Sequence, residues 1–281
     1  MDKGLPAKLI QTNEKFNLFD LLEIRYFIES LDFSPGKYTI SDDTWKSAKK
    51  KLWDKYKESE KIDICINLIK DFELSNPKRK YRSDFEIFIR ESKLEDFINA
   101  DVETVLVSTI HKAKGKEFDN VILMLDGFNP DNDERKRVLY VAMTRAKNNL
   151  SIHLNGSYLD DISSEKIERK NDNFKYKPSN LLISQLTHKD IFLNYFILKQ
   201  DAIAKLKGGD RLIITNDGCS DESGKSILKF SNSYKQIIAE FESRGYKPAE
   251  GKINYILYWQ KEELENEILI VLPELRFLKK I

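Results

Sequence analysis

The alternation of apolar and polar positions divides the chain into a helical stretch, a central α/β stretch and a mixed stretch. In the centre, two apolar, β-branched runs, Val105–Thr109 and Val121–Leu125, predict fully buried strands. A helical pattern follows over Asp133–Ala146, and Leu150–Leu154 returns as a third strand. This order predicts part of an open α/β sheet, in which ligands bind at the carboxyl ends of the strands. The polar turn Ile110–Asn120 would lie at such an end.

Before the centre, apolar residues recur mostly at helical spacing. Ala7–Thr12 predicts a short strand, and Leu18–Leu31 predicts an amphipathic helix. Ser41 and Ser83 stand where N-terminal helix caps are expected. The three further predicted helices are Asp42–Ser59, Lys61–Leu74 and Ser83–Phe97.

After the centre, Tyr158–Lys189 is polar, lacks periodicity and predicts a linker. A small α+β module should follow, with Gly245 as a left-handed helix cap and Pro273 closing the last strand. Three aromatic residues, Tyr255, Tyr258 and Trp259, lie on one predicted strand. They either contact a partner or pack in the core. The predicted elements of the module are Ile191–Lys205 (helix), Arg211–Thr215 and Ser226–Phe230 (strands), Ser233–Arg244 (helix), and Lys252–Gln260 and Glu267–Leu272 (strands).

Composition narrows the functional classes. The chain has 281 residues, with 47 basic and 46 acidic side chains, so any nucleic-acid site must be a local patch. No apolar run approaches the ~18 residues of a membrane span, which argues against a membrane partner. Cys65 and Cys219 are distant in sequence and have no metal-ligand spacing. We therefore expect a cytoplasmic protein with reduced cysteines and no metal site of its own.

One short motif is misleading. Gly224-Lys225-Ser226 resembles the end of a phosphate-binding loop. However, Gly218 stands one residue farther upstream than the G-x-x-x-x-G-K-[ST] pattern requires, and no helix is predicted after the motif. We do not expect ATP to bind there.

The central stretch carries two long motifs in sequence. The segment VSTIHKAKGKEFDNVIL resembles motif V, and RVLYVAMTRAK resembles motif VI, of superfamily 1 DNA helicases of the UvrD/Rep/PcrA type. Lys116 departs from this pattern, because the UvrD group usually has an apolar residue there. The link between the motifs, Asp126–Lys136, is short, as in the RecD-like branch, so the resemblance leaves the translocation polarity open.

The resemblance implies an α/β fold, namely the second RecA-like domain of a helicase, with a parallel sheet and flanking helices. A helical insertion would interrupt this domain, and a small α+β domain would follow it. The implied boundaries are residues 1–34 and 101–157 for the RecA-like domain (2A), 35–100 for a small 2B-like insertion, 158–190 for a linker and 191–281 for an accessory domain.

The resemblance also implies roles in nucleotide binding. Arg145 corresponds to the arginine finger, although an arginine late in a helix also suits its C-terminus. Glu117 corresponds to the ribose contact, and Gly115 permits a tight turn beside the ligand. Tyr140 and Val141 are expected in the core. The remaining residues expected near the nucleotide are Arg137, Gln11 and Arg25.

For DNA, the resemblance places Thr109 and His111 at the strand-facing part of motif V. Two basic clusters in the predicted insertion, beside Trp53 and Tyr81, suit a phosphate backbone with stacked bases. Ordinary solvated helix faces explain these clusters nearly as well. The cluster residues are Lys49, Lys50, Lys51, Lys78, Arg79, Lys80 and Arg82.

The sequence contains neither a phosphate-binding loop nor a D-E-x-Q motif. We therefore expect the C-terminal part of an ATP-dependent DNA helicase that is inactive by itself, with DNA repair as one of the pathways left open. Its ATP and Mg²⁺ would be held largely by a missing N-terminal RecA-like domain, which supplies the Mg²⁺ ligands. Expected partners are that domain and DNA that is single-stranded or at a junction, and residues 191–281 are a candidate surface for a protein partner. The alternative is a non-catalytic scaffold derived from a helicase domain.

Overall fold

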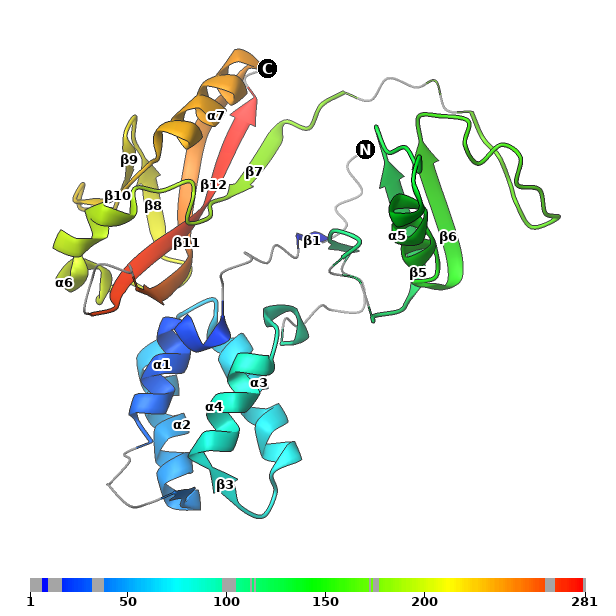
Figure 1. Ribbon diagram of the computed structural model, residues 1–281. Helices are drawn as coiled ribbons and strands as arrows, with labels where there is room; N and C mark the ends of the chain where they lie inside the picture. Colours follow the sequence, from blue (N-terminus) through cyan, green and yellow to red (C-terminus); the bar gives the residue numbers. More distant parts are fainter. Residues whose placement is uncertain are drawn as a thin grey trace. The chain divides into compact units, whose positions relative to one another are not determined.

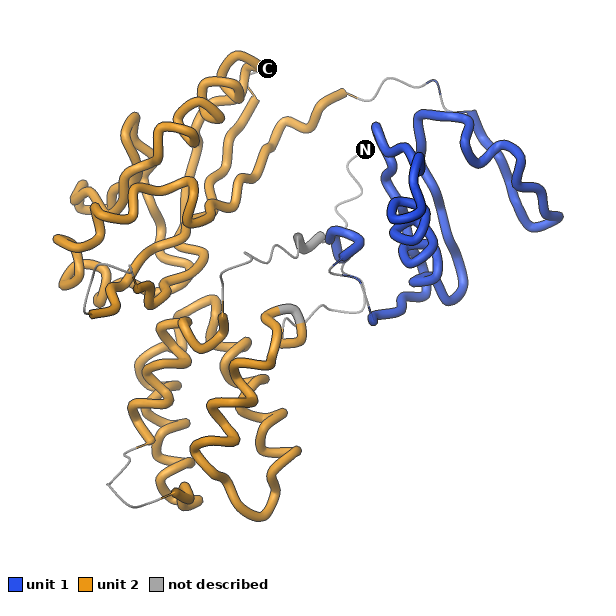
Figure 2. Tube along the Cα trace, in the orientation of Figure 1, with its two compact units in different colours: residues 1–11, 100–176 blue, residues 12–99, 177–281 orange. Residues whose placement is uncertain are grey.

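The computed structural model describes residues 7–9, 17–31, 38–97, 105–111, 113, 115–171, 173, 177–260 and 266–279. The chain divides into two compact units (Figure 2). Unit 1 comprises residues 1–11 and 100–176, and unit 2 comprises residues 12–99 and 177–281. Each unit therefore joins two stretches that are distant in sequence, and each is described here by itself.

Unit 1 contains a parallel strand pair connected by a helix (Figure 1). Strand β5 (Phe118–Leu125) pairs in parallel with β6 (Ala146–Leu154), and helix α5 (Asp133–Met143) lies between them in the chain. The side chain of Asn132 caps α5 by accepting a 2.9 Å hydrogen bond from Arg135 N. The buried core of this unit consists of Leu123, Leu125, Leu139 and Ala142.

A second parallel pair in unit 1 joins β1 (Ala7–Leu9) to β4 (Val105–Val107). Parallel strands need a long crossover between them, and in both pairs the connection is long enough. The predicted α/β class with parallel pairing is confirmed. The predicted full burial of the strand at residue 105 is wrong, because the side chains of Val105 and Val107 are both exposed.

Strand β5 is likewise buried on one face only. Ile122 and Met124 are 63% and 73% exposed, whereas Leu123 and Leu125 are buried. Side chains of a strand alternate between the two faces of a sheet, and α5 packs against one of them. The apolar run predicted a strand covered on both sides, and this prediction is corrected accordingly.

Helix α5 turns a different face inward from the one expected. Tyr140, predicted to lie in the core, is 69% exposed. Leu139 and Ala142 are buried instead, and each residue of a helix is rotated by about 100° from the one before it. Tyr140 therefore stands on the outer side of α5, while its neighbour Val141 is half-buried.

The first part of unit 2 is helical, as predicted. Ser41 Oγ accepts a 3.1 Å hydrogen bond from Thr44 N, which confirms the predicted cap. The cap predicted at Ser83 is wrong, because the helix begins at Arg82 and Glu86 accepts a 2.6 Å hydrogen bond from Arg82 Nε. The described elements are the 3₁₀ turn η1 (Leu18–Asp20), helices α1 (Leu22–Glu29), α2 (Asp42–Tyr56), α3 (Ile62–Ser75) and α4 (Arg82–Glu91), the 3₁₀ turn η2 (Leu94–Asp96), and the antiparallel pair β2 (Thr39–Ile40) and β3 (Lys80–Tyr81).

Aromatic side chains hold these helices together. The rings of Phe72 and Phe85 have centroids 4.8 Å apart, and those of Phe27 and Trp45 are 5.1 Å apart, both in edge-to-face contact. Each of these side chains is fully buried. No helix in the described part of the chain combines the length and the apolar character needed to cross a membrane.

The second part of unit 2 is an antiparallel sheet, which the described residues order as β10-β9-β8-β11-β12-β7. Helix α7 contacts β11, and the ring of Phe241 on α7 lies 5.1 Å from that of Phe277 on β12. The elements are β7 (Leu181–Gln185), η3 (Leu193–Leu198), α6 (Gln200–Ile203), β8 (Arg211–Ile214), β9 (Gly218–Ser220), β10 (Ser226–Lys229), α7 (Asn232–Ser243), β11 (Tyr246–Trp259) and β12 (Ile268–Lys279).

Two backbone predictions in this module have different outcomes. Gly245 follows α7 with φ +87°, which confirms the predicted left-handed cap. Pro273 does not close a strand, because β12 continues through it to Lys279. Pro273 lies opposite Ile253, next to a register shift on β11, and a proline without an N–H is tolerated at such an irregularity.

The boundary expected at residue 190 also needs revision. Strand β7 falls inside the segment predicted as a linker, yet it pairs with β12 from Leu181↔Leu278 to Gln185↔Glu274. The polar character of this segment concealed a strand whose partner lies about ninety residues later in the sequence, beyond the reach of local patterns. The sheet of unit 2 thus begins at residue 181.

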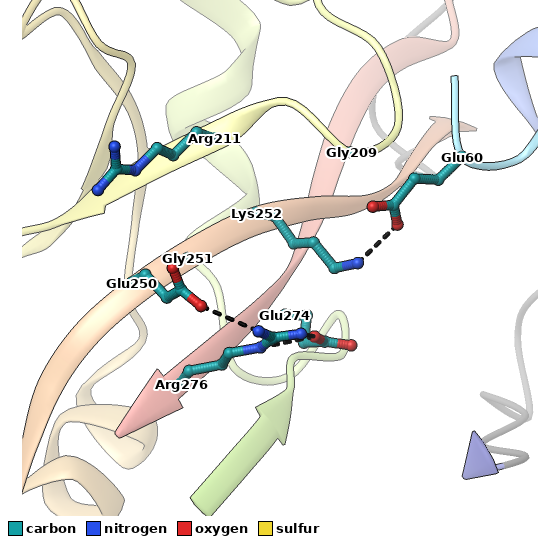
Figure 3. A pocket seen from close by; sticks show the side chains of 8 residues that line it. All are labelled: Glu60, Gly209, Arg211, Glu250, Gly251, Lys252, Glu274 and Arg276. Atoms are coloured by element: carbon teal, nitrogen blue, oxygen red, sulfur yellow. Dashed lines mark hydrogen bonds and ion pairs between the residues drawn. The ribbon is translucent and has the colours of Figure 1, made fainter. Parts of the chain in front are cut away.

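The helical part and the sheet of unit 2 share one buried core. Glu60 N donates a 2.9 Å hydrogen bond to Gly208 O, and Lys252 Nζ forms a 2.6 Å ion pair with Glu60 (Figure 3). Lys61 Nζ donates a 2.8 Å hydrogen bond to Asn254 Oδ1. The helices therefore do not stand apart from the C-terminal sheet as a separate insertion.

The three aromatic residues of β11 contribute to this joint. The Lys61 ammonium lies 4.5 Å from the ring centroid of Tyr255, and the Arg25 guanidinium lies 4.7 Å from that of Tyr258. Tyr255, Tyr258 and Trp259 are all half-buried against the shared core. Of the two interpretations left open by the sequence, core packing is the one that these contacts favour.

Candidate functional site

A tight turn connects β4 to β5 in unit 1. Ala113 N donates to Thr109 O at 3.3 Å, and Lys116 N donates to Ala113 O at 3.1 Å. Gly115 has φ +84° and nothing lies within 4 Å of where a Cβ would stand, so the backbone conformation, not lack of space, requires glycine there. Lys112 and Lys114 lie outside the described residues.

Arg145 joins the helix end to this turn. Its Nη1 donates a 3.2 Å hydrogen bond to Lys116 O, and its Nε donates a 2.9 Å hydrogen bond to Val141 O. Its Nη2 donates to Thr144 Oγ1 at 3.2 Å. Helix α5 ends at Met143, so Arg145 follows the helix and does not lie within it as predicted. The half-buried guanidinium therefore links the two motifs of the central stretch.

The strand after Arg145 is bulged. Phe118 pairs with Ala146, whereas the next recorded pair is Asn120 with Asn149, so β6 contains one extra residue at this point. Phe118 N also donates a 2.9 Å hydrogen bond to Arg145 O. Bulges commonly re-aim side chains at functional sites, and this one directly follows the candidate finger.

Three side-chain hydrogen bonds fix β6 beside β5 beyond the bulge. Each joins an asparagine of β6, or of the turn after it, to the residue opposite. They are Asn148 to Asp119 (3.1 Å), Asn149 to Asn120 (2.8 Å) and Asn155 to Asp126 (2.6 Å). These bonds lock the register that holds residue 145 beside residue 116.

The other predicted residues of unit 1 that the structure describes are exposed. Glu117 directly follows Lys116, whose carbonyl accepts a hydrogen bond from Arg145. Glu117 therefore lies near Arg145. Thr109 and His111 lie exposed on the same turn. Arg137 is exposed on α5.

The residues of the two predicted basic clusters have different surroundings in unit 2. Lys49 pairs with Glu73 at 2.8 Å, and Arg82 pairs with Glu86 at 2.6 Å. Lys80 is buried and pairs with Asp42 at 3.2 Å. The remaining cluster residues are all exposed and are Lys50, Lys51, Lys78 and Arg79.

Two residues predicted near the nucleotide remain. Arg25 forms an ion pair with Glu267 and lies between the rings of Phe19 (4.8 Å) and Tyr258 (4.7 Å). These contacts belong to the joint between the helices and the sheet of unit 2. Gln11 lies outside the described residues. The structure therefore brings together Arg145, Glu117 and Gly115, and it gives Arg25 a packing environment.

A basic and aromatic stripe on α2 was overlooked in the sequence. Lys46, Lys50, Trp53 and Lys57 are all exposed, and they follow one another at spacings of four, three and four residues. Such spacing places side chains on one side of a helix. The signal was present in the sequence, but the consecutive run Lys49–Lys51 drew attention to adjacent residues, which point in different directions. We call Lys46, Lys50, Trp53 and Lys57 the α2 stripe.

The described residues show no cluster of three or more histidine, cysteine, aspartate or glutamate side chains that could hold a metal ion. Both cysteines are buried, and burial raises the pKa of the Cys219 thiol to about 12. The Cys65 thiol pKa is also raised, through burial first and then the neighbouring Glu23. Neither thiol is suited to act as a nucleophile or a metal ligand.

Comparison with known proteins defines the class. The model of the UvrD-like helicase C-terminal domain family matches residues 10–157, more than half of the chain, and the chain belongs to this family. The matched range contains both central motifs and helices α1 to α4 of unit 2. The resemblance inferred from the two motifs is thereby confirmed.

One curated relative extends the comparison. The chain is 27% identical over 161 residues to a Bacillus subtilis (strain 168) protein described as "Putative ATP-dependent DNA helicase YjcD". The match covers 52% of this chain and 20% of that protein, so the chain spans a small part of its relative's length. No solved structure matches the chain.

Proposed function

We propose that this chain provides the C-terminal half of the ATP site, and part of the DNA track, of an ATP-dependent DNA helicase or translocase. The observation that supports this most is the hydrogen bond from Arg145 to the carbonyl of Lys116, beside Glu117. It unites the finger, the ribose contact and the turn glycine within one compact unit. Membership of the helicase C-terminal domain family supports the same assignment.

Arg145 keeps hydrogen-bonding capacity for a ligand. A guanidinium carries five N–H groups, and the recorded bonds use one on each nitrogen. Among the described residues, one N–H therefore remains without a partner on each terminal nitrogen, a pair suited to phosphate oxygens. In the proposed role these two donors neutralise charge on the γ-phosphoryl group during transfer, while the other three hold the side chain in place.

The nucleotide fits the residues present. Glu117 offers an exposed carboxylate for ribose hydroxyls, and the turn at Gly115 leaves open space above its backbone. Bound ATP with Mg²⁺ supplies the phosphoryl group and much of its charge neutralisation. The phosphate-binding loop and the Mg²⁺ ligands would come from an N-terminal RecA-like domain. The parallel pairs β1–β4 and β5–β6 support the assignment of unit 1 to the second RecA-like domain.

DNA contact is proposed for two surfaces, each within its own unit. Thr109 and His111 are exposed on the turn of unit 1 and suit contacts to phosphate, which position a strand without reading its sequence. In unit 2, the α2 stripe combines three exposed lysines with Trp53, which is 49% exposed and available for base stacking. We expect single-stranded DNA, or a single/double-strand junction, as the partner.

The test is ATP turnover by the complete helicase that carries this chain, with single-stranded DNA present. Arg145→Ala should lower kcat by roughly 10³-fold or more and leave KM nearly unchanged, because the finger acts on the transition state. Arg145→Lys should restore little, since lysine lacks the planar fork. A raised KM with unchanged kcat would contradict the proposal.

Arg135→Ala is the matched control. Arg135 lies on the same helix, and its ion pair with Asp131 is exposed and 3.4 Å long. Because exposed ion pairs contribute at most about 1 kcal/mol, this variant should keep its turnover. Equal losses in the two variants would indicate that Arg145 only stabilises the end of α5.

A further inference from the structure

Two lysines approach the ring of Tyr195 in the C-terminal module. Its ring centroid is 5.1 Å from the ammonium of Lys199 and 5.2 Å from that of Lys229. Tyr195 belongs to η3, Lys199 directly follows this turn, and Lys229 ends β10. A 2.8 Å hydrogen bond from Phe192 N to Lys229 O fixes η3 against β10, so the three side chains are held together by the backbone.

A hydroxyl pair completes the group. The Tyr195 hydroxyl and Ser226 Oγ are 2.9 Å apart and hydrogen-bonded. Ser226 opens β10 and belongs to the Gly224-Lys225-Ser226 sequence. Gly224, with φ +83°, lies in a tight turn in which Asp221 accepts from Lys225 N at 2.9 Å, and a strand follows this turn. Ser226 therefore faces Tyr195 and is not part of a phosphate-binding loop.

The local charge is positive. The pKa of the Tyr195 hydroxyl is lowered, first by its hydrogen bond with Ser226 and then by Lys199 and Lys229. The carboxylate that acts on Lys229 is that of Asp217, which already pairs with Lys235 at 2.6 Å. Within the described part of the chain, no ion pair joins Lys199 or Lys229 to a carboxylate. Both ammonium groups lie near the same ring, so both attract an anion placed beside the Tyr195 hydroxyl.

We propose that Lys199, Lys229, Tyr195 and Ser226 form a binding site for a phosphate oxyanion. Two ammonium groups supply charge-assisted donors, and the two hydroxyls supply donors of adjustable direction. Inorganic phosphate and the phosphodiester of a nucleic-acid backbone present the same oxyanion. The site lies in the region that the helicase family model does not match, and it is independent of the role proposed for Arg145.

The experiment uses the whole chain and two probes. Inorganic phosphate binding is followed by ³¹P NMR titration, and a fluorescent thymidine oligonucleotide is followed by anisotropy at two salt concentrations. Lys199→Ala with Lys229→Ala should weaken binding of the occupying probe about tenfold. For the oligonucleotide, loss of two lysine contacts should reduce the slope of log K against log salt by about 1.4. Tyr195→Phe should weaken binding less, because both ammonium groups remain.

Lys205→Ala with Lys247→Ala is the matched control, since both lysines are exposed in the same module and the same charge is removed. If only the Lys199/Lys229 double variant loses binding, the result supports the site. Whether the lost probe is phosphate or the oligonucleotide identifies the source of the oxyanion. Equal loss in both pairs, or no binding of either probe to the parent chain, overturns the proposal. Because ATP turnover is not the readout, failure here would leave the helicase assignment intact.

Discussion

Ser59 Oγ donates a 2.6 Å hydrogen bond to Glu23 Oε1 in the interior of unit 2, and among the described residues Glu23 Oε2 has no hydrogen-bond partner. Glu23 lies on α1, and Ser59 lies in the turn between α2 and α3. A buried carboxylate with one unsatisfied oxygen is costly when it is ionised. The joint between the helices and the sheet therefore contains a titratable group that favours its protonated form.

This arrangement predicts how stability depends on pH. Burial raises the pKa of Glu23 above its ordinary value, although Ser59 and Lys61 partly oppose this. Between the ordinary and the raised pKa, the folded chain binds more protons than the unfolded chain. The free energy of unfolding should therefore fall as pH rises through this window, and stay lower above it. Tyr56 and Cys65 also adjoin Glu23, but burial raises their pKa values, so both remain neutral throughout the window.

Glu23→Gln should remove this dependence and stabilise the chain at neutral pH by on the order of 1 kcal/mol. Urea unfolding measured from pH 4 to pH 8 tests the prediction. Glu29→Gln is the matched control, because Glu29 lies on the same helix and is exposed. If the two substitutions gave parallel pH profiles, the buried carboxylate would not be the source of the effect.

The α2 stripe predicts the character of DNA binding by unit 2. Trp53→Ala should weaken binding of a thymidine oligonucleotide by about 1–3 kcal/mol, the usual contribution of a stacked base. Lys50→Ala with Lys57→Ala should reduce the salt slope by about 1.4. Fluorescence anisotropy measures both. Leu74→Ala removes another exposed apolar side chain from the helical part, and it should leave affinity unchanged.

A chain that ends at residue 176 should lose the fold of its helical part. The sequence predicts that residues 191–281 form a separate accessory domain. The shared core changes this expectation, because Leu21 bridges to Leu257 and Ile24 and Phe27 are fully buried within that core. Circular dichroism of the truncated chain should show reduced helix content and no cooperative unfolding. A truncated chain with native helix content and a sharp transition would show that the helices fold independently.

The isolated 281-residue chain should hydrolyse ATP no faster than buffer, because its sequence has no phosphate-binding loop. A coupled turnover assay with single-stranded DNA checks this. Activity that persisted through re-purification and disappeared with Arg145→Ala would show that the chain completes an ATP site without the N-terminal RecA-like domain.

Local features were predictable from the sequence. The cap at Ser41 and the left-handed Gly245 depend on residues within one turn, and both are confirmed. The parallel strands of unit 1 follow from the alternation of apolar runs and a helix. The roles of Glu117 and Arg145 in nucleotide binding stay predictions, although the structure brings these two residues together.

Long-range features were not predictable. Arg25 pairs with Glu267 across 242 positions of sequence, and β7 joins a sheet whose other strands come later. The direction in which Tyr140 points depends on which side of α5 meets β5, and the sequence of the helix alone allowed the opposite choice. The burial of Lys80 on β3 likewise required knowledge of Asp42 and Trp45, which approach it from helix α2.

Because unit 2 is completed only by residues 177–281, its folding during synthesis must be delayed. Residues 12–99 leave the ribosome before residues 177–281, which form the sheet that covers their apolar side chains. At about 5–20 residues per second, roughly 10–40 s pass between translation of residue 99 and of residue 281. During this interval the nascent helices expose the side chains around Phe27, because Leu257 has not yet been synthesised. Residues 12–99 are therefore the stretch for which a chaperone would be needed.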